Sequence, residues 1–388
     1  MRPAEDGPPL RVLHVAEAFG GGVLEMIATL AAGGAAAGDE VTVAYGRRPE
    51  TPVDPRSKID PAVELVSLGW ESRGAAEQAR AWRRLRRLVA ARRPDVVHLH
   101  SSFAGVAGAI ALPAAQPTVY TPHGYSFTMA DRGPAANLAF RAIERLTARR
   151  ATVVGAVSEA EAAAAREVAP ADRIVVVRNG VPELDDLPLD GPEPPRPEPR
   201  RAIVLGRITA QHLPAASARI LGGVADVGEI EWVGGGGTDP AELETVTAGG
   251  VPVSGWLDRA EVMQRLADAT ALLHWTGWDG QPLSILEAMA ADVVVVGHDI
   301  EAVREILGPG QVAAEEAEAT AMLRRALTDP EWRRAAIESQ RHRRLRYGAA
   351  RMVTEWRALY RQLSARFEPS VQKSAPAPIQ TAERLPRT

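Results

Sequence analysis

The chain has 388 residues, of which 46% are hydrophobic and 24% are charged, a composition typical of a soluble globular protein with room for two domains. Its net charge of -4 argues against a nucleic-acid partner, and the absence of cysteine excludes disulfides, thiolate nucleophiles and cysteine metal sites. No apolar run reaches the roughly 18 residues that span a bilayer. Residues 1–9 hold no apolar signal core, so we expect a cytoplasmic protein.

The first half of the chain alternates apolar runs with Ala- and Arg-rich stretches. Residues 10–16 are expected to form a buried strand, followed by a glycine turn at 20–22 and a helix. Further strands are expected at residues 40–45, 95–100, 117–124, 152–158 and 173–181. Continuous apolar strands separated by helices predict a parallel sheet that is covered on both faces.

One predicted helix of this half, at residues 75–93, has a basic face. It places Trp82, Leu85 and Val89 on one side and surrounds them with arginines. We favour an ordinary covering helix with a solvated basic face. The alternative is a helix that lies on a membrane surface and gives the protein a weak peripheral membrane contact.

A proline-rich stretch divides the chain. Residues 182–200 contain seven prolines and can continue neither a helix nor a sheet, so we place an interdomain linker at 183–200 and a first domain at 1–182. A second series of strands is expected at residues 201–207, 230–237, 251–256, 269–275 and 292–297. The predicted fold class is therefore α/β, with two doubly wound domains in tandem.

The rest of the chain completes the second domain. It extends over 201–349 and is followed by a closing helix at 350–367. Residues 368–388 are rich in polar residues and proline, and we expect them to be disordered.

Open parallel sheets bind ligands at the carboxyl ends of their strands, so we expect ligand-binding residues in the loops that follow the strands. Gly21 and Gly22 follow the first strand, where missing side chains allow a diphosphate to approach the backbone near a helix start. Contact with phosphate and a simple tight turn both remain open interpretations. The pattern is not G-x-G-x-x-G, which disfavours a dinucleotide.

Three histidines fall on neighbouring predicted strands. His98 and His100 share one face of a strand, and His123 ends the next strand. No carboxylate or cysteine accompanies them at ligand spacing, so a metal site is disfavoured. We expect one or two of these histidines to face the cleft as polar contacts.

Arg207 directly follows the first strand of the second domain. A guanidinium group in that position can hold two phosphate oxygens at once. The alternative is an ordinary surface arginine, in a chain where nearly every basic residue is arginine.

The segment DGQPLSILE at residues 279–287 has an acid at each end. Pro282 suits the first turn of a helix, which leaves Asp279 in a loop and lets the first backbone N–H groups, those of residues 283–285, face an anion. Glu287 lies just over a turn into the helix, on an apolar run where a carboxylate needs partners such as ligand hydroxyls. The alternative for Glu287 is a place on an exposed stripe.

The order of these motifs resembles that of the retaining glycosyltransferases of family 4, the glycogen-synthase-like group with the GT-B fold of two Rossmann-like domains. The resemblance covers about residues 10–365. It rests on the glycine loop, RPDVVHLH, TPHGYSF, the Ser-Glu pair at 158–159, VVVRNGV, LGR, VSGW and the helix with two acids. TPHGYSF is most similar to members that build exopolysaccharide or cell-surface glycans.

The resemblance implies an acceptor-binding first domain and a second domain that binds the nucleotide sugar. It implies His123, Arg207 and Asp279 as catalytic residues. The residues implied in donor binding are Gly21 and Gly22 near the diphosphate, Arg207 and His212 on it, Gly255, Trp256 and Leu257 at the base, Asp279, Gly280 and Gln281 at the sugar, Pro282, Leu283 and Ser284 at the phosphates, and Glu287 at the ribose. No metal and no other cofactor is implied.

Three positions depart from the family pattern. The first acid of the helix motif is usually Glu, and Asp279 is shorter by one methylene. His212 stands where the family has a lysine, and beside a diphosphate its protonated form would be favoured, so donor binding is expected to weaken as the pH rises past neutral. Asp292 and Val294 replace a usual Gly and Pro.

The expected function is transfer of a sugar from a nucleotide sugar, by default a UDP-sugar, to a hydroxyl or amine of a glycan, lipid-linked or natural-product acceptor, with retention of configuration. One alternative is a relative that hydrolyses or epimerises the sugar nucleotide. Another is an inactive partner that binds sugar nucleotides, an interpretation to which the changes at Asp279 and His212 lend weight.

Overall fold

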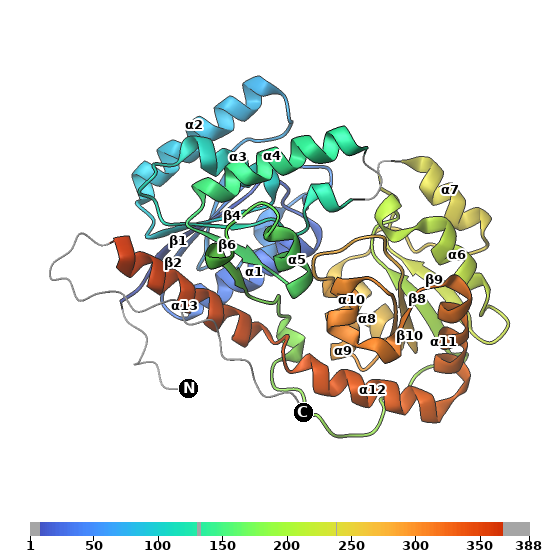
Figure 1. Cartoon of the computed structure of the whole chain (residues 1–388). Coiled ribbons are helices and arrows are strands. Elements are labelled where there is room, and N and C mark those ends of the chain that lie inside the picture. The colour runs from blue at the N-terminus through green and yellow to red at the C-terminus, as the bar shows by residue number, and fades with distance from the viewer. Residues whose placement is uncertain (1–7, 130–132, 238, 368–388) are drawn as a thin grey trace.

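The computed structural model describes residues 8–129, 133–237 and 239–367, so the predicted tail at 368–388 lies outside the described residues. Two lobes lie side by side, and each is built around one parallel sheet (Figure 1). The strand order is β3-β2-β1-β4-β5-β6-β7 in the first sheet and β12-β11-β10-β8-β9 in the second. The predicted fold class, two doubly wound α/β domains in tandem, is confirmed.

The first lobe follows the predicted alternation closely. Its elements are β1 (Arg11–Ala16), α1 (Gly21–Ala36), β2 (Glu40–Tyr45), β3 (Glu64–Ser67), α2 (Ala75–Arg92), β4 (Val96–His100), α3 (Ser102–Ala111), β5 (Thr118–Thr121), α4 (Pro134–Arg150), β6 (Val153–Ala156), α5 (Glu159–Ala165) and β7 (Ile174–Val176). β3 was not predicted. It is a short edge strand in which no residue is fully buried, so it lacks the apolar pattern of the central strands.

The second lobe contains β8 (Arg201–Leu205), α6 (Pro214–Gly222), β9 (Glu229–Val233), α7 (Pro240–Ala248), α8 (Arg259–Asp268), β10 (Ala271–His274), α9 (Leu283–Ala290), β11 (Val294–His298), α10 (Glu301–Leu307), β12 (Val312–Ala313), α11 (Glu316–Thr328) and α12 (Pro330–Arg344). The strand predicted at 251–256 is wrong. Val253 and Gly255 form only isolated bridges, because Pro252 lacks a donor and Gly255 turns the chain with a φ of +74°.

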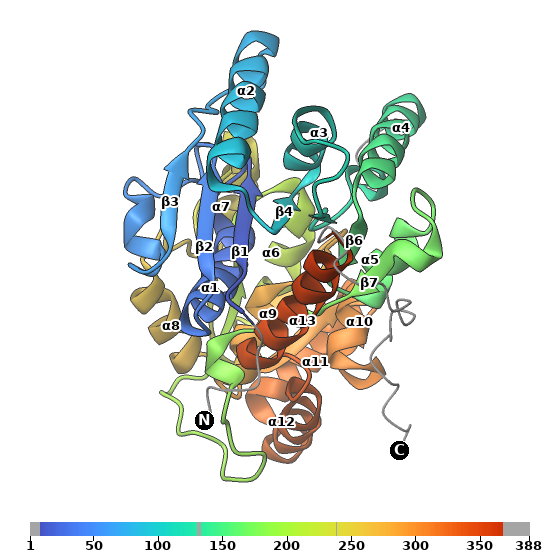
Figure 2. The same cartoon turned by 90° about the vertical axis from the view of Figure 1, so that its left-hand side faces the viewer.

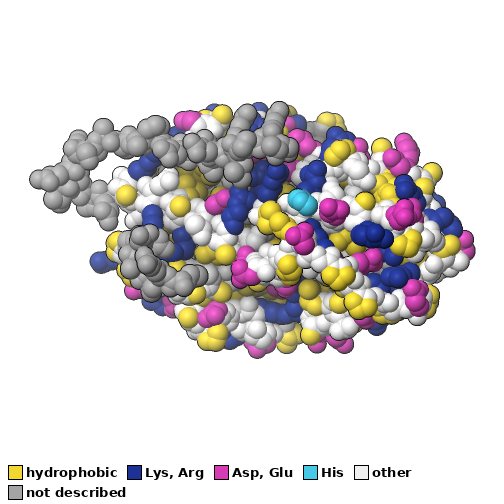
Figure 3. Space-filling model, turned by 90° about the horizontal axis from the view of Figure 1, so that it is seen from below, with side chains coloured by type: hydrophobic (Ala, Val, Ile, Leu, Met, Phe, Trp, Pro, Cys, Tyr) yellow, Lys and Arg dark blue, Asp and Glu magenta, His cyan; other side chains and the backbone are white. Residues whose placement is uncertain are grey.

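Helix α2 covers the first sheet. Leu85 is fully buried, Val89 nearly so, and Trp82 packs against the same core, so the apolar face of α2 is used inside the lobe. No helix in the described part of the chain is long and apolar enough to cross a membrane. Seen from below, basic and acidic side chains are interspersed over the surface that is drawn (Figure 3).

The last helix, α13 (Ala349–Phe367), returns to the first lobe and lies near α1 (Figure 2). Met352, Trp356 and Tyr360 are buried in the core that α1 and β1 build. Arg357 forms a buried ion pair with Asp39, with 2.6 Å between Nε and Oδ2. The closing helix therefore belongs to the core of the first lobe.

The chain crosses between the lobes at two adjacent points. The outgoing segment passes Val181 and the 3-10 turn Pro182–Leu184, and residues 185–200 then form neither strand nor helix. The returning segment passes Gly348. The two segments are joined by hydrogen bonds from Val181 N to the Tyr347 carbonyl (2.9 Å) and from Ala349 N to the Val181 carbonyl (3.3 Å).

Asp292, one of the three departures from the family pattern, has a structural role. Its backbone has a φ of +52°, a conformation in which Asp is better tolerated than most residues. Its carboxylate accepts from Arg341 at 2.6 Å and from Arg344 at 2.8 Å. These arginines also donate to carbonyls of Pro188 and Gly191, so Asp292 helps to fix α12 and the proline-rich segment against the lobe.

Candidate functional site

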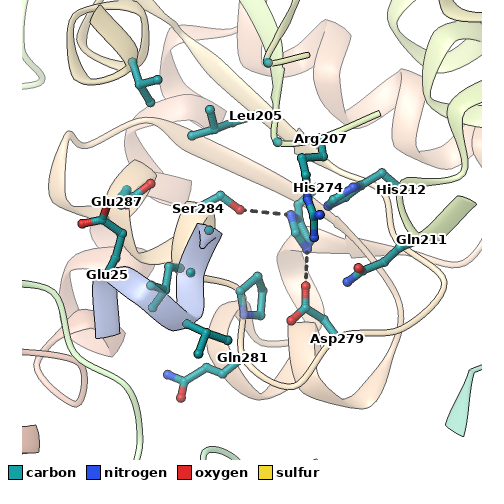
Figure 4. Close-up of a pocket in the computed structure, with 18 of the residues that line it drawn as sticks. Glu25, Leu205, Arg207, Gln211, His212, His274, Asp279, Gln281, Ser284 and Glu287 are labelled. Atoms are coloured by element: carbon teal, nitrogen blue, oxygen red, sulfur yellow. Dashed lines mark hydrogen bonds and ion pairs between the residues drawn. The ribbon is translucent and has the colours of Figure 1, made fainter. Parts of the chain in front are cut away.

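A cavity of about 440 Å³ opens between the lobes at the carboxyl ends of strands from both sheets. It brings together all but one of the residues that the family resemblance implies: Gly21, Gly22, His123, Arg207, His212, Trp256, Leu257, Asp279, Gly280, Gln281, Pro282, Leu283, Ser284 and Glu287. Gly255 is the exception and does not line the cavity. Figure 4 shows several of these side chains converging from separate segments.

Two helices begin at the cavity wall. α1 starts at Gly21, whose φ of +56° favours glycine, and its N-cap Gly20 supplies no side-chain hydrogen bond. α9 starts at Leu283 after Pro282, again without a side-chain cap. A Cβ atom added to Gly22 would lie 3.5 Å from Leu283, so the two helix starts face each other across the lobes. Uncapped N–H groups and aligned dipoles favour an anion between them.

Asp279 lies in the loop before α9, as predicted, and has an unpredicted neighbour in His274. The Oδ2 atom of Asp279 is 3.6 Å from Nε2 of His274. Nδ1 of His274 is 3.4 Å from the Ser284 hydroxyl (Figure 4). The histidine is only 3% exposed. No local pattern marks His274, since it is simply the last residue of an apolar strand.

Arg207 is exposed at the cavity and forms no ion pair among the described residues. His212 lines the same wall. Burial lowers its pKa to about 4, outweighing the opposite effect of Asp279. The protein by itself therefore favours the neutral form of His212, and protonation of His212 beside a diphosphate stays a prediction.

Glu287 is 6% exposed, which excludes the exposed-stripe alternative. It pairs with Arg259 of α8, which also holds Glu183 at 3.0 Å. Burial raises the pKa of Glu287, while Arg259 acts in the opposite direction. Arg259 was missed in the sequence because nothing local distinguishes it from the many surface arginines.

An exposed tryptophan, Trp256, lies at the rim of the cavity. Trp256 is 66% exposed although it lines the cavity, and Leu257 is beside it. An exposed indole at a pocket rim offers a flat surface on which a base can stack. Gly255 contributes only the preceding turn.

The histidines form a chain behind the cavity. His123, with a φ of +54°, lines the cavity, and its Nε2 is 3.1 Å from Nδ1 of His100. The other nitrogen of His100 is 3.1 Å from Nδ1 of His14 on β1. His98 and His100 are fully buried, so of the three predicted histidines one, His123, faces the cleft. Burial lowers the pKa of His123 to about 4 and that of His14 to about 3.

Ring nitrogens of His14, His98 and His100 lie within 4.8 Å of one another, the spacing of a metal-ligand group. Both nitrogens of His98 already have partners, however. Nδ1 is 2.6 Å from the Tyr360 hydroxyl, and Nε2 is 2.8 Å from the Thr121 hydroxyl. Since His14 and His100 are also hydrogen-bonded to each other, these contacts favour a structural cluster.

Several contacts join the lobes beside Asp279. Ser158 donates its hydroxyl to the carbonyl of Gly280 at 2.8 Å. Gln281, which we expected to address sugar hydroxyls, instead accepts from Asn179 N at 2.7 Å and donates to its carbonyl at 3.3 Å. The Gln281 amide is thus occupied in holding the first lobe.

Glu161 supports the same junction. Its carboxylate accepts from the N–H groups of Gly124 (2.5 Å) and Val157 (2.8 Å). Burial raises its pKa to about 7. Glu161 also lines a smaller cavity of about 160 Å³, on the other side of the loop that carries Asp279.

Two acids of the first lobe were not predicted. Glu25 on α1 and Glu50 line the main cavity. Figure 4 shows the carboxylates of Glu25 and Glu287 near each other, one from each lobe. The end of the cavity at Glu287 is therefore acidic, with Arg259 as a counter-charge paired to Glu287.

Family models match both lobes. A model described as a glycosyl transferase 4-like domain matches residues 21–180, and one described as glycosyl transferases group 1 matches residues 204–329. The chain belongs to the family 4-like glycosyltransferases. Among curated protein sequences, no match to this glycosyltransferase is found.

Solved structures show the same two-lobed GT-B fold. Sucrose-phosphate synthase from Thermosynechococcus elongatus is 16% identical, with a TM-score of 0.76 over 92% of this glycosyltransferase and 100% of that chain. HepE from Anabaena, in complex with UDP and glucose, is 17% identical, with a TM-score of 0.72 over 92% and 100%. WaaG, a glycosyltransferase involved in lipopolysaccharide biosynthesis, is 17% identical, with a TM-score of 0.66 over 90% and 99%.

Proposed function

We propose that this glycosyltransferase moves a sugar from a nucleotide sugar, with UDP-sugars as the first choice, to an acceptor hydroxyl or amine with retention of configuration. The observation that carries the proposal is the convergence of two helix starts without side-chain caps and the exposed Arg207 on one cavity. Each helix start corresponds to roughly half a positive charge, so together with one guanidinium they suit a diphosphate.

The remaining lining residues fit the two ends of such a donor. Trp256 offers a stacking surface for the base, and the paired carboxylate of Glu287 offers acceptors for ribose hydroxyls. At the opposite end, Asp279 and His123 lie beside the space for the sugar. HepE has been seen with UDP-glucose, which supports a UDP-sugar as the first donor to test.

The proposed chemistry needs no metal. The bond from the anomeric carbon to the diphosphate oxygen breaks while the acceptor oxygen or nitrogen forms a bond to the same face of that carbon. The acceptor proton passes to the leaving diphosphate oxygen. Arg207 and the helix starts stabilise the charge that develops on the diphosphate. His123, held neutral by the burial that lowers its pKa, can hydrogen-bond the sugar without adding a charge.

The donor is tested by thermal unfolding with UDP-, GDP-, ADP- and TDP-glucose. A donor at 100 times its Kd should stabilise the fold by about 2.7 kcal/mol. Turnover is then measured with and without an acceptor panel, and the anomer of the product is read by NMR. Stabilisation by none of the four donors would contradict the proposal.

The same experiment separates the alternatives. Consumption of the donor without any acceptor identifies a hydrolase or epimerase. Binding without turnover over a broad acceptor panel identifies an inactive sugar-nucleotide-binding partner. A product with inverted anomeric configuration would support sugar transfer but contradict the proposed retention of configuration.

A further inference from the structure

His274 carries a buried polar atom at the cavity wall whose position needs an explanation. The side chain ends β10, is 3% exposed, and lines the cavity between the lobes. Its Nε2 has no hydrogen-bond partner among the described residues. Leaving a buried donor or acceptor unpaired is costly, so such an atom needs a function.

The neighbours of the ring determine where its proton lies. The hydroxyl of Ser284, 3.4 Å from Nδ1, can donate to that nitrogen. A neutral imidazole that accepts at Nδ1 carries its proton on Nε2. This N–H then faces Oδ2 of Asp279, which is 3.6 Å away.

Both distances are longer than those of good hydrogen bonds. Hydrogen bonds in an empty catalytic site are often long and tighten when the substrate is bound. Figure 4 shows the imidazole of His274 between Ser284 and Asp279, with a dashed line to each. A small movement of the Asp279 loop would complete a chain of hydrogen bonds from the Ser284 hydroxyl through the His274 imidazole to the Asp279 carboxylate.

We propose that His274 is the positioning residue of Asp279 and thereby a determinant of which sugar is accepted. The inference rests on the function proposed above. His274 holds Oδ2, which leaves Oδ1 of Asp279 to accept from one sugar hydroxyl at a fixed place. The short side chain of Asp279 and the imidazole of His274 depend on each other, since a glutamate at this position would place its carboxylate against or beyond the ring.

A purely structural role would give a different result on substitution. The ring of His212 lies edge-on to that of His274, with 6.2 Å between the centroids. The other residues of β10 are buried and apolar. If His274 only filled space, His274→Phe would leave the choice among sugars unchanged. If it positions Asp279, the ring must retain a hydrogen-bond donor.

The test measures kcat/KM for UDP-glucose, UDP-galactose and UDP-N-acetylglucosamine, and the Kd of UDP, which has no sugar. For a protein that binds but does not turn over, the ratio of Kd values replaces the ratio of kcat/KM. We expect His274→Phe to reduce the ratio between the best and poorest donor at least tenfold, with the Kd of UDP within twofold. His274→Gln, which retains an N–H donor, should keep most of the selectivity.

His298→Phe is the matched control. His298 ends the neighbouring strand β11, is hydrogen-bonded to the Thr276 carbonyl, and does not line the cavity. Its substitution should leave the donor ratio unchanged. In the double variant Asp279→Asn and His274→Phe, the loss of selectivity should equal that of Asp279→Asn alone, because His274 acts through Asp279.

An unchanged donor ratio in His274→Phe would overturn the inference, as would an equal loss of affinity for UDP and for the UDP-sugars. Independent, additive losses in the double variant would also overturn it. Failure of the proposed function is distinguished at the first step, since the wild-type protein would then be stabilised by none of the four nucleotide sugars.

Discussion

His100 connects the cavity residue His123 to the interior of the first lobe: its Nδ1 lies 3.1 Å from Nε2 of His123. Its other nitrogen contacts His14, so each ring nitrogen of His100 faces another histidine. A neutral imidazole donates through one nitrogen and accepts through the other. The proton position on His123 is therefore tied to two residues that never reach the cavity.

The substitution His100→Phe should reduce kcat roughly ten- to a hundredfold while the Kd of UDP stays the same. The reason is that His123 loses the partner that fixes its ring and its tautomer, and small misplacements of catalytic groups are costly. His100→Asn is the control, because its amide can still reach His123, and it should retain more activity. Equal loss in both variants would indicate general damage to the core.

The buried histidines should make the fold sensitive to acid. Burial lowers the folded-state pKa of His14 to about 3, whereas the unfolded value is about 6.5. The unfolded chain thus binds more protons below pH 6.5, and stability is lost as the pH falls. At pH 5 this one residue should account for about 2 kcal/mol. Urea unfolding of wild type and His14→Asn between pH 7 and 5 should show a smaller pH dependence in the variant.

Arg259→Met should destabilise the fold by roughly 2 to 4 kcal/mol and raise the KM for the donor. It leaves the buried carboxylate of Glu287 without its charged partner. Adding Glu287→Gln should recover stability, since no buried charge remains, but should not recover donor affinity. Recovery of both would show that neither residue contacts the nucleotide. Urea unfolding and donor titration measure the two effects separately.

Gly280→Ala should weaken the junction of the lobes. An added Cβ atom would lie 3.3 Å from Gly124 N and 3.4 Å from Oε1 of Glu161, closer than most such contacts. We expect a loss of roughly 1 to 2 kcal/mol in stability and a lower kcat/KM. Gly277→Ala, whose Cβ would have its nearest neighbour at 3.7 Å, is the control in the same loop. Similar effects of both changes would argue against a specific role of this contact.

The sequence predicted those parts of the fold and site that are encoded locally. Apolar runs followed by glycine, arginine or an acid correctly indicated the strands and the loops at their ends. The pattern failed at 251–256, where a proline and a turning glycine prevent a ladder. It also missed the edge strands β3 and β12, which are too short to give a clear apolar pattern.

The missed site residues share one physical cause. The importance of His274 depends on where Asp279 and Ser284 lie after folding, and that of Arg259 depends on a carboxylate from another helix. The burial that lowers the pKa of His212 is likewise a property of the packed lobe. Residue type and spacing in the sequence do not indicate which side chains become neighbours after folding.

The return of α13 makes the first lobe a noncontiguous domain. A fragment that ended near Val181 would lack Met352, Trp356 and Tyr360, and would expose the apolar surface that they cover. Cutting the chain in the proline-rich segment therefore cannot release the two lobes as independent units, whereas circular permutation that joins α13 directly to β1 could. Since the two crossings are hydrogen-bonded to each other, both covalent connections between the lobes leave the first lobe at one place.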